Sequence, residues 1–212
     1  MGGYADKYDG DYYMRGVQTG KSLYENYRWM PQQTIPMCQA IVAHLGVKKD
    51  QTVLDFGCAR GYTVRAFREM GYIAFGYDIS EWAVANADES IKHHLTRYQE
   101  VAAAIKPDWI IAKDVLEHID DLCQVVELLK VARKGILAVV PLAHGTHWDT
   151  YDVPDYEKDV THVHRRPLSW WVNIFHQPGW SVEGRYRIKG IKDNYAQFPT
   201  GNGFITCRRI ER

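Results

Sequence analysis

Apolar residues in the first two thirds of the chain form short continuous runs, which alternate with segments of helical spacing. The runs predict strands at about residues 52–56, 72–77, 95–99, 108–113 and 135–140. Between them, the spacing predicts helices at residues 35–46, 62–70 and 80–93, and one that begins near Asp120 or Asp121. This alternation predicts an α/β domain with a parallel sheet, right-handed crossovers and a ligand at the carboxyl ends of the strands.

The last third of the chain has a less regular pattern. The helix that begins near Asp120 is expected to place Leu122, Val126 and Leu129 on one face. Residues 141–163 show no periodicity, which is typical of a long functional loop. Beyond this loop, the pattern predicts a helix at residues 167–176 and strands at residues 180–188 and 203–208.

The strand predicted at residues 52–56 leads into a glycine turn that has the composition of a nucleoside-binding site. Asp55 precedes the turn, which contains Gly57 and Gly61, and Asp78 closes the next apolar run. A strand, a glycine turn, a helix and a second strand with a terminal carboxylate form an arrangement that binds ribose hydroxyls. A cofactor that contains adenosine is therefore expected.

The residues between the glycines narrow the choice of cofactor. A dinucleotide fingerprint needs glycines where this chain has Ala59 and Tyr62, so a pyrophosphate would be poorly accommodated. A phosphate-binding loop needs Lys and then Ser or Thr after the last glycine, whereas Gly61 is followed by Tyr62 and Thr63. The remaining candidate contains adenine and ribose but no phosphate, a description that S-adenosylmethionine meets.

Three segments in this order resemble the motifs of class I S-adenosylmethionine-dependent methyltransferases. They are residues 53–61, 76–80 and 108–119, and the last contains the Leu-Glu-His sequence of the small-molecule branch of that family. Two features depart from the family pattern: Ala59 replaces a turn glycine, and no acidic motif is evident between His93 and Lys106. The resemblance implies a doubly wound, Rossmann-like, seven-stranded and mostly parallel sheet whose last strand is antiparallel.

The resemblance also implies which residues contact the cofactor. Asp55 is expected to orient the turn by accepting backbone N–H groups, and Asp78 to accept the ribose hydroxyls. Ile79 and Trp82 are expected to form the adenine wall, although Trp82 would suit the core equally well. The predicted cofactor-binding residues are Asp55, Gly57, Cys58, Ala59, Gly61, Asp78, Ile79, Trp82, Lys113 and Asp114. Glu117 and His118 are expected to stabilise the loop that follows.

The N-terminal segment is unusually aromatic. Six of the 14 tyrosines lie in it, at Tyr4, Tyr8, Tyr12, Tyr13, Tyr24 and Tyr27. We therefore divide the chain into an N-terminal arm, residues 1–34, and a methyltransferase domain, residues 35–212, with an acceptor loop at residues 141–166. The arm is expected to close over the cofactor as a lid, or to pack on the sheet edge or a second copy of the chain as a homodimer contact.

The acceptor loop concentrates histidines and acidic residues. His144, His147, His162 and His164 all lie in it, together with Asp149, Asp152, Asp155 and Asp159. A hydroxyl acceptor needs a base, and imidazole suits that role at neutral pH. His162 matches the family histidine that follows an acidic residue, so His162, His144 and Asp159 are the catalytic candidates. The histidines could alternatively bind a divalent metal, although no metal ligand is assigned.

Composition excludes several other classes of protein. Lys plus Arg equals Asp plus Glu, 26 each, so no nucleic-acid partner is expected. No run approaches the ~18 apolar residues of a membrane span, and the first residues lack the features of a secretion signal, so we expect a cytoplasmic protein without a membrane partner. The chain length of 212 residues fits one main domain, and the four cysteines show no paired spacing.

Together these observations predict a S-adenosylmethionine-dependent methyltransferase. Its methyl acceptor is expected to be an oxygen or nitrogen of a small or glycan-like polar molecule. Two alternatives remain at this point. One is a catalytically silent S-adenosylmethionine-binding scaffold or sensor, and the other is a metal-assisted O-methyltransferase that uses His144, His147, His162 and His164. The glycine turn disfavours a nicotinamide dehydrogenase.

Overall fold

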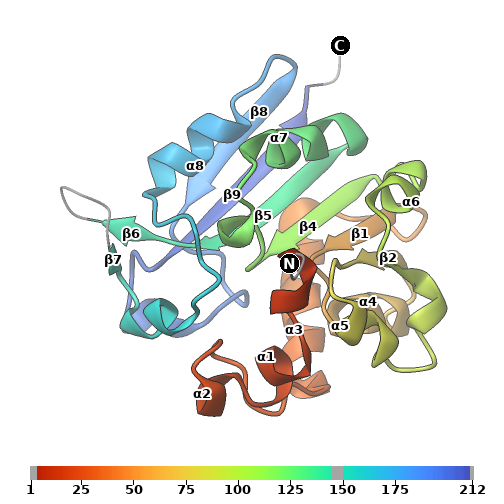
Figure 1. Cartoon of the computed structure of the whole chain (residues 1–212). Helices are drawn as coiled ribbons and strands as arrows, with labels where there is room; N and C mark the ends of the chain where they lie inside the picture. Colours follow the sequence, from red (N-terminus) through yellow and green to blue (C-terminus); the bar gives the residue numbers. More distant parts are fainter. Residues whose placement is uncertain (1–3, 145–149, 211–212) are drawn as a thin grey trace.

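One seven-stranded sheet forms the centre of the molecule (Figure 1). The computed structural model describes residues 4–144 and 150–210. The strand order is β3-β2-β1-β4-β5-β9-β8, and β9 runs antiparallel to both of its neighbours. The strands are β1 Thr52–Phe56, β2 Ile73–Tyr77, β3 Leu95–Thr96, β4 Trp109–Lys113, β5 Gly135–Pro141, β8 Trp180–Arg185 and β9 Asn202–Arg209. The predicted Rossmann-like sheet with an antiparallel last strand is therefore confirmed.

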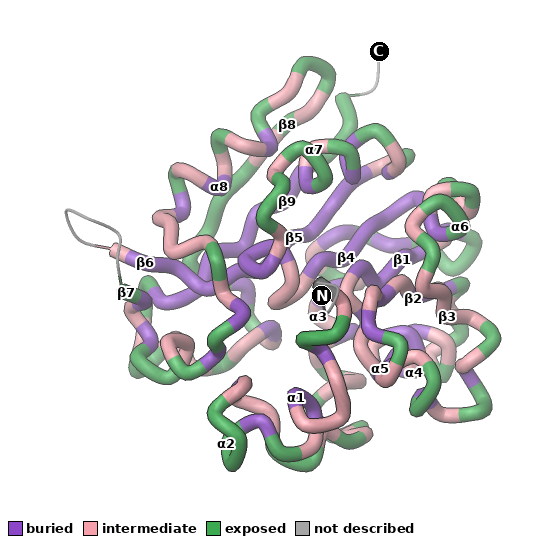
Figure 2. The backbone as a smooth tube through the Cα atoms, viewed as in Figure 1, coloured by how far each residue is buried: buried purple, intermediate pink, exposed green. Residues whose placement is uncertain are grey.

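Helices cover both faces of this sheet and bury its central strands (Figure 2). One face packs against α3 (Pro31–Leu45) and α4 (Tyr62–Glu69). The other packs against α6 (Gln99–Ala104), α7 (Leu122–Val131) and α8 (Leu168–Phe175). Every residue of β5 is buried, as expected for an apolar strand that is covered on both faces. Among the described residues, no helix has the length and apolar character needed to span a membrane.

The helix after β2 is shorter than its sequence predicts. Ser80 caps it as expected, because its Oγ accepts a hydrogen bond from the Ala83 N–H at 3.0 Å. However, α5 covers only Glu81–Ala85, so the prediction of a helix to residue 93 was wrong. The Asn86 side chain donates to the Trp82 carbonyl at 2.8 Å, and such a local bond competes with helix continuation. A short 3₁₀ helix, Lys92–His94, follows before β3.

Two further details differ from the predicted pattern. The sequence suggested no helix between β3 and β4, but α6 lies there. The strand predicted at residues 95–99 is only two residues long in the structure, as β3. In α7 the buried apolar residues are Val125, Leu128 and Leu129. Val126 was predicted to point inward, but its neighbour Val125 is buried instead, so that prediction was wrong. The helix is therefore rotated relative to the expected face, and Leu122 packs at the margin of the core.

The acceptor loop contains local structure of its own. Ala143–His144 (β6) and Thr150–Tyr151 (β7) pair as an antiparallel two-stranded sheet, and a 3₁₀ helix, Pro154–Lys158, follows. The predicted site residues His147 and Asp149 lie outside the described residues. The hairpin projects from the end of β5, while the later part of the loop returns toward the centre of the molecule (Figure 1). Residues near 160 are thus placed close to the strand ends.

The N-terminal arm lies next to the carboxyl ends of the central strands (Figure 1). It contains a 3₁₀ helix, Tyr4–Lys7, and the short helices α1 (Gly10–Met14) and α2 (Gly16–Thr19). Asp9 caps α1 by accepting from the Tyr12 N–H at 2.9 Å. The buried rings of Tyr8, Tyr12 and Tyr13 form a cluster with Ala83 of α5, which anchors the arm to the sheet domain.

Candidate active site

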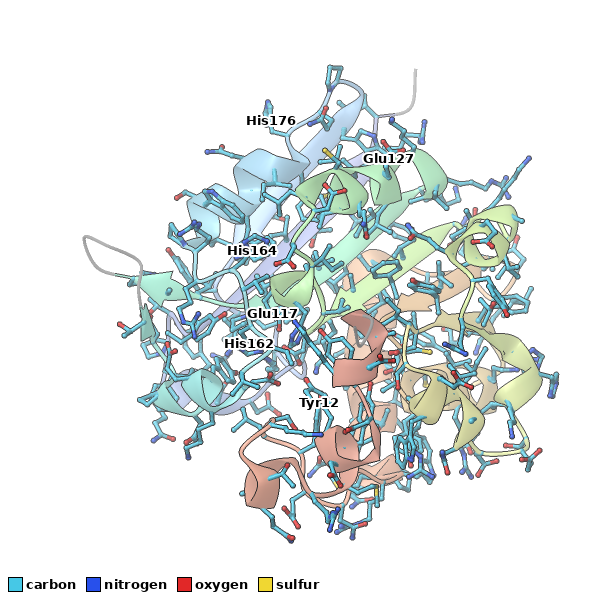
Figure 3. All side chains as sticks on the ribbon, viewed as in Figure 1. Tyr12, Glu117, Glu127, His162, His164 and His176 are labelled. Carbon is cyan, nitrogen blue, oxygen red and sulfur yellow. The ribbon has the colours of Figure 1, made fainter. Side chains whose placement is uncertain are left out.

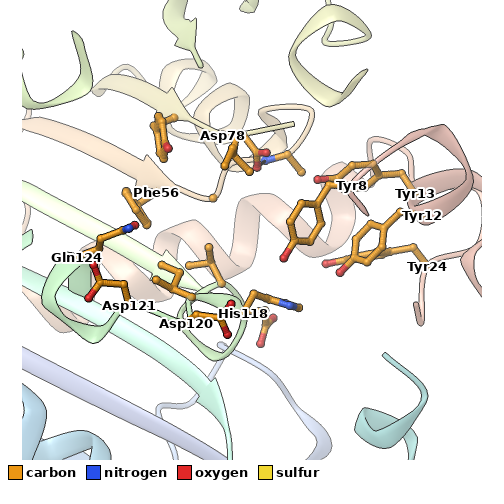
Figure 4. A pocket seen from close by; sticks show the side chains of 17 residues that line it. Tyr8, Tyr12, Tyr13, Tyr24, Phe56, Asp78, His118, Asp120, Asp121 and Gln124 are labelled. Carbon is orange, nitrogen blue, oxygen red and sulfur yellow. Dashed lines mark hydrogen bonds between the residues drawn. The ribbon is translucent and has the colours of Figure 1, made fainter. Parts of the chain in front are cut away.

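A cavity of about 400 Å³ lies at the carboxyl ends of β1, β2 and β4 (Figure 4). Tyrosines of the N-terminal arm gather at one end of it, and residues from the start of α7 lie at the other. Its lining residues come from four parts of the chain: Tyr8, Tyr12, Tyr13, Tyr24, Phe56, Gly57, Ala59, Tyr77, Asp78, Ile79, Asp114, Val115, His118, Ile119, Asp120, Asp121 and Gln124. This is the position at which parallel α/β sheets bind ligands.

The glycine turn after β1 is held by the end of β2. The Asp78 carboxylate accepts hydrogen bonds from the Ala59 N–H at 2.6 Å and from the Ser80 N–H at 2.8 Å. Burial raises the pKa of Asp78 to about 6, although both N–H groups favour its charged form. Gly57 has φ +82°, and a Cβ there would lie 2.5 Å from Val115, so the turn requires glycine at that position. Asp78 thus fixes the turn and also faces the cavity.

Asp55 has a different environment from the one its sequence position suggests. The N–H groups of Gly57 and Cys58 donate to the Tyr77 carbonyl at 2.8 and 2.9 Å, so Asp78 and the β2 backbone hold the turn. Burial raises the pKa of Asp55 to about 7, because its effect is larger than the opposing effect of the Lys113 ammonium. The Thr63 side chain also favours the charged form of the Asp55 carboxyl and so acts to lower its pKa. Asp55 does not line the cavity, and neither does Cys58.

Apolar residues form the wall of the cavity near Asp78. Phe56, Ile79 and Val115 line it, and the Phe56 ring lies 5.0 Å from that of Tyr77. Trp82, a predicted adenine contact, is not among the lining residues. Its ring stacks on Tyr13 with centroids 5.6 Å apart and an interplanar angle of 14°. Trp82 is partly buried and packs against the tyrosine cluster of the arm.

The end of β4 contributes a buried carboxylate between two ammonium groups. Asp114 lines the cavity, and its oxygens lie 2.5 Å from both the Lys113 and the Lys192 Nζ atoms. Burial alone would raise the pKa of Asp114, but these two cations hold it well below its usual range. Lys192 was not predicted from the sequence, because no nearby motif connects it with β4. Lys113 itself does not line the cavity.

A hydrogen bond joins the N-terminal arm to the acceptor loop. The Tyr12 hydroxyl donates to Asp159 Oδ2 at 2.8 Å, and both side chains are buried. On the other side of the arm, the Ser80 hydroxyl donates to the Tyr8 carbonyl at 2.5 Å. The arm is therefore bonded to both sides of the cavity, and its tyrosine rings cover the space between them.

A group of buried titratable side chains lies beside the cavity, next to the arm residue Tyr12 (Figure 3). We call Glu117, His118, Asp159 and His162 the Glu–His cluster. His162 Nε2 lies 3.9 Å from Glu117 Oε1 and 4.0 Å from Asp159 Oδ2, and the rings of His118 and His162 have centroids 4.7 Å apart. His118 lines the cavity, so the cluster borders it directly.

Burial decides the charge state of this cluster. It raises the pKa of Glu117 to about 8, an effect that the neighbouring Asp114 reinforces. It lowers the pKa of His162 to about 4, and proximity to His118 acts in the same direction. It also lowers the pKa of His118. Both imidazoles are therefore neutral at physiological pH, and each has one unprotonated ring nitrogen.

The predicted histidines do not come together among the described residues. His144 Nδ1 lies 2.7 Å from Asp152 on the β6–β7 hairpin, and His164 Nε2 is hydrogen-bonded to the Ile119 carbonyl at 2.8 Å. Neither residue lines the cavity. Of the three catalytic candidates, His162 and Asp159 lie together behind His118, which lines the cavity, and His144 does not join them. Glu117 and His118, for which support of the following loop was favoured over a catalytic part, complete the group.

A parallel sheet with a glycine turn, a buried strand-end carboxylate and a cavity above them defines a nucleoside-binding α/β protein. A family model described as a methyltransferase domain matches residues 31–183. The chain belongs to this methyltransferase family, because the match covers well over half of its length. The predictions of a class I S-adenosylmethionine-dependent methyltransferase and of its cofactor are thereby confirmed.

Solved structures share this fold at low sequence identity. A S-adenosylmethionine-dependent methyltransferase from Archaeoglobus fulgidus matches with a TM-score of 0.62 and 16% identity, over 85% of this chain and 95% of that one. The plantazolicin methyltransferase BamL, in complex with a triazolic desmethylPZN analog and SAH, matches with a TM-score of 0.58 and 12% identity, over 85% and 86%. The YcgJ protein from Bacillus subtilis matches with a TM-score of 0.57 and 16% identity, over 83% and 99%. No curated protein sequence matches the chain.

Proposed function

We propose that the chain binds S-adenosylmethionine in the cavity beneath the N-terminal arm and methylates an oxygen or nitrogen of a small or glycan-like polar acceptor. The observation that carries this proposal is that a single cavity adjoins both Asp78 and the Glu–His cluster, through His118. A carboxylate suited to a ribose and groups that can accept a proton therefore border the same space. In this proposal the arm acts as the lid.

The residues near Asp78 fit the adenosine half of this cofactor. Each Asp78 oxygen accepts one backbone N–H, and because a carboxylate has about four acceptor positions, two remain for ribose hydroxyls. Phe56, Ile79 and Val115 provide the apolar walls that an adenine ring requires. Bound S-adenosylmethionine would supply an electrophilic methyl group on a positively charged sulfur, and the ring face of Tyr12 would favour that charge.

The acceptor is proposed to bind beside the Glu–His cluster. During transfer, the acceptor atom forms a bond to the methyl carbon while the carbon–sulfur bond breaks and leaves its electron pair on sulfur. The acceptor proton must leave as well, and His162 is our candidate to take it. Its Nδ1 is buried without a hydrogen-bond partner, and the ring is neutral because its pKa is lowered to about 4. The neutral ring of His162 thus has one unprotonated nitrogen that can take a proton.

The low pKa of His162 changes the expected pH dependence. If His162 had the pKa of an unperturbed imidazole, turnover would rise through a pKa near neutrality. With a pKa of about 4, the base form of His162 is already fully populated above about pH 5. Protonation of His162 therefore contributes no inflection to the rate profile between pH 6 and 8.

A screen for S-adenosylhomocysteine release tests the proposed reaction. The acceptors would be hydroxylated sugars, small hydroxylated metabolites and small amines, each incubated with the protein and S-adenosylmethionine. Acceptor-dependent release from one chemical class is the expected result. Binding of S-adenosylmethionine without release from any acceptor would instead favour the silent scaffold or sensor.

Replacement of Asp78 by alanine should weaken binding of S-adenosylhomocysteine about 10- to 150-fold. This range corresponds to the loss of charge-assisted hydrogen bonds worth about 1.5 to 3 kcal/mol. The variant should also lose some stability, because the Ala59 and Ser80 N–H groups lose their acceptor. Isothermal titration calorimetry gives the affinity, and a thermal melt gives the stability.

Ser80→Ala is the matched control for Asp78→Ala. It removes the cap of α5 and a bond to the arm, so it should cost about 1 kcal/mol of stability. The Asp78 carboxylate remains in place, and the affinity should change by less than about threefold, or ~0.6 kcal/mol. Equal losses of affinity in the two variants would mean that Asp78 acts only by supporting the turn.

A further inference from the structure

Three side chains of the Glu–His cluster place ligand atoms at the spacing of a metal site. Glu117, His118 and His162 each offer one such atom, and the three atoms lie within 4.8 Å of one another. Glu117 Oε1 is 4.0 Å from His118 Nε2 and 3.9 Å from His162 Nε2. A point at equal distance from these three atoms lies about 2.4 Å from each of them. This distance is close to the ~2.0–2.2 Å at which nitrogen and carboxylate ligands bind Zn²⁺.

The hydrogen bonds around His118 direct a lone pair toward this point. The Thr161 hydroxyl has one proton, and it donates that proton to Asp159 Oδ1 at 2.5 Å. Thr161 must therefore accept the proton on His118 Nδ1, which lies 2.8 Å from its Oγ1. The His118 Nε2 is then unprotonated. A carboxylate or hydroxyl that fixes the far nitrogen is the usual support of a metal-binding histidine.

The remaining two side chains have polar atoms without partners. Glu117 Oε2 and His162 Nδ1 are buried and form no hydrogen bond, and the Glu117 residue is only 1% exposed. A buried carboxyl group with an unpartnered oxygen is destabilising, because it has lost water without gaining a partner. A cation at the centre of the cluster would satisfy the carboxylate.

We propose that Glu117, His118 and His162 bind one divalent first-row transition-metal cation at the acceptor end of the cavity. Two imidazoles and one carboxylate suit Mn²⁺, Co²⁺ or Zn²⁺, whereas Mg²⁺ and Ca²⁺ prefer sites built from oxygen atoms. Three protein ligands leave coordination positions open for an acceptor atom. This set shares only His162 with the four histidines that the sequence suggested, and it does not include His144 or His164.

The site also bears on the acceptor, and this step rests on the proposed methyl transfer. A cation that binds an acceptor hydroxyl lowers the pKa of that hydroxyl and thereby favours loss of its proton to solvent. His162 then acts as a ligand through Nε2, and it no longer takes the proton itself. An oxygen acceptor is favoured over an amine, because the cation would occupy the lone pair of an amine nitrogen, which must attack the methyl group.

Metal binding can be measured without cofactor or acceptor. Untagged protein, first treated with a chelator and then freed of it, is titrated with Co²⁺ by calorimetry and by visible absorption. We expect saturable binding of one ion per chain. Glu117→Gln and His162→Gln should each weaken it at least 10-fold, and Thr161→Val, which removes the partner of His118, should weaken it about 10-fold. His144→Gln should bind Co²⁺ like the wild type.

Thermal melts in the presence of a chelator show whether each variant is folded. One folded variant among Glu117→Gln and His162→Gln is enough to compare its Co²⁺ affinity with that of the wild type. The proposal is overturned if no ion binds stoichiometrically, if the folded Glu117 and His162 variants bind as the wild type does, or if His144→Gln abolishes binding. Failure of the proposed methyl transfer would be seen separately, because the titration contains neither S-adenosylmethionine nor an acceptor.

Discussion

Replacement of His162 by glutamine is expected to lower the turnover of methyl transfer by ~10² to 10⁴, the range for loss of a positioned proton-transfer group. His162 lies in the Glu–His cluster, 3.9 Å from Glu117, and is not among the residues that line the cavity around Asp78. The affinity for S-adenosylhomocysteine should therefore stay within about twofold, or ~0.4 kcal/mol. Steady-state turnover and calorimetry on the same preparation measure the two quantities.

His164→Gln is the matched control, because it makes the same substitution at a neighbouring histidine of the same loop. The His164 side chain is hydrogen-bonded to the Ile119 carbonyl, and a glutamine amide can also donate to that group. Turnover of this variant should remain within about threefold of wild type, or ~0.6 kcal/mol. Full turnover by His162→Gln would exclude His162 both as the base and as an essential cation ligand.

Replacement of Asp55 by asparagine is expected to flatten the pH dependence of stability. The pKa of Asp55 is raised from its ordinary value of 3.8 to about 7, because the carboxyl is buried. Between these two pH values the folded state keeps a proton that the unfolded state has lost, so the free energy of unfolding falls as pH rises from about 4 to about 7 and then levels off. The full effect is on the order of 4 kcal/mol, from a pKa difference of about three units.

Urea denaturation of the cofactor-free protein at pH 5, 6, 7 and 8 measures this effect. The difference in unfolding free energy, Asp55→Asn minus wild type, should increase with pH, because asparagine does not ionise. Asp50→Asn, an exposed substitution in the turn before β1, should follow the wild-type profile. Parallel profiles for Asp55→Asn and wild type would show that the Asp55 carboxyl ionises as readily in the folded state as in the unfolded one.

Patterns that are local in sequence predicted the sheet and the turn correctly. The strands β1, β4 and β5 are continuous apolar runs buried on both faces, so their positions follow from composition alone. Gly57 and Gly61 adopt positive φ angles, as a tight turn between a strand and a helix requires. Asp78 follows β2 directly, and its position at the cavity was therefore predictable.

Two kinds of contact were harder to predict from the sequence: side-chain hydrogen bonds that end a helix, and packing between distant segments. The bond from Asn86 to the Trp82 carbonyl ends α5 early, although the residues beyond it have helical spacing. Trp82 was expected at the adenine site, but Tyr13, which is distant from it in the chain, stacks on it. Such contacts depend on how the arm folds back across the sheet, which no local pattern specifies.

The Glu–His cluster shows the same limit at the candidate site. His144 and His162 belong to the same loop, yet the β6–β7 hairpin holds His144 beside Asp152, away from the cavity. Glu117 and His118 are distant from His162 in the sequence, and they meet it because the acceptor loop returns to the end of β4. The Leu-Glu-His motif was the available signal, but its partner could be found only from the tertiary structure.

The central claim is that the cavity beneath the N-terminal arm is an S-adenosylmethionine site. A thermal-shift panel with S-adenosylmethionine, S-adenosylhomocysteine, NAD and ATP tests it most directly. A ligand at ~100 times its dissociation constant adds about 2.7 kcal/mol, which corresponds to roughly 5 to 10 °C for a chain of this size. We expect a shift of this size with the two adenosyl sulfur compounds and none with NAD or ATP. A shift with NAD and none with the adenosyl sulfur compounds would contradict the account.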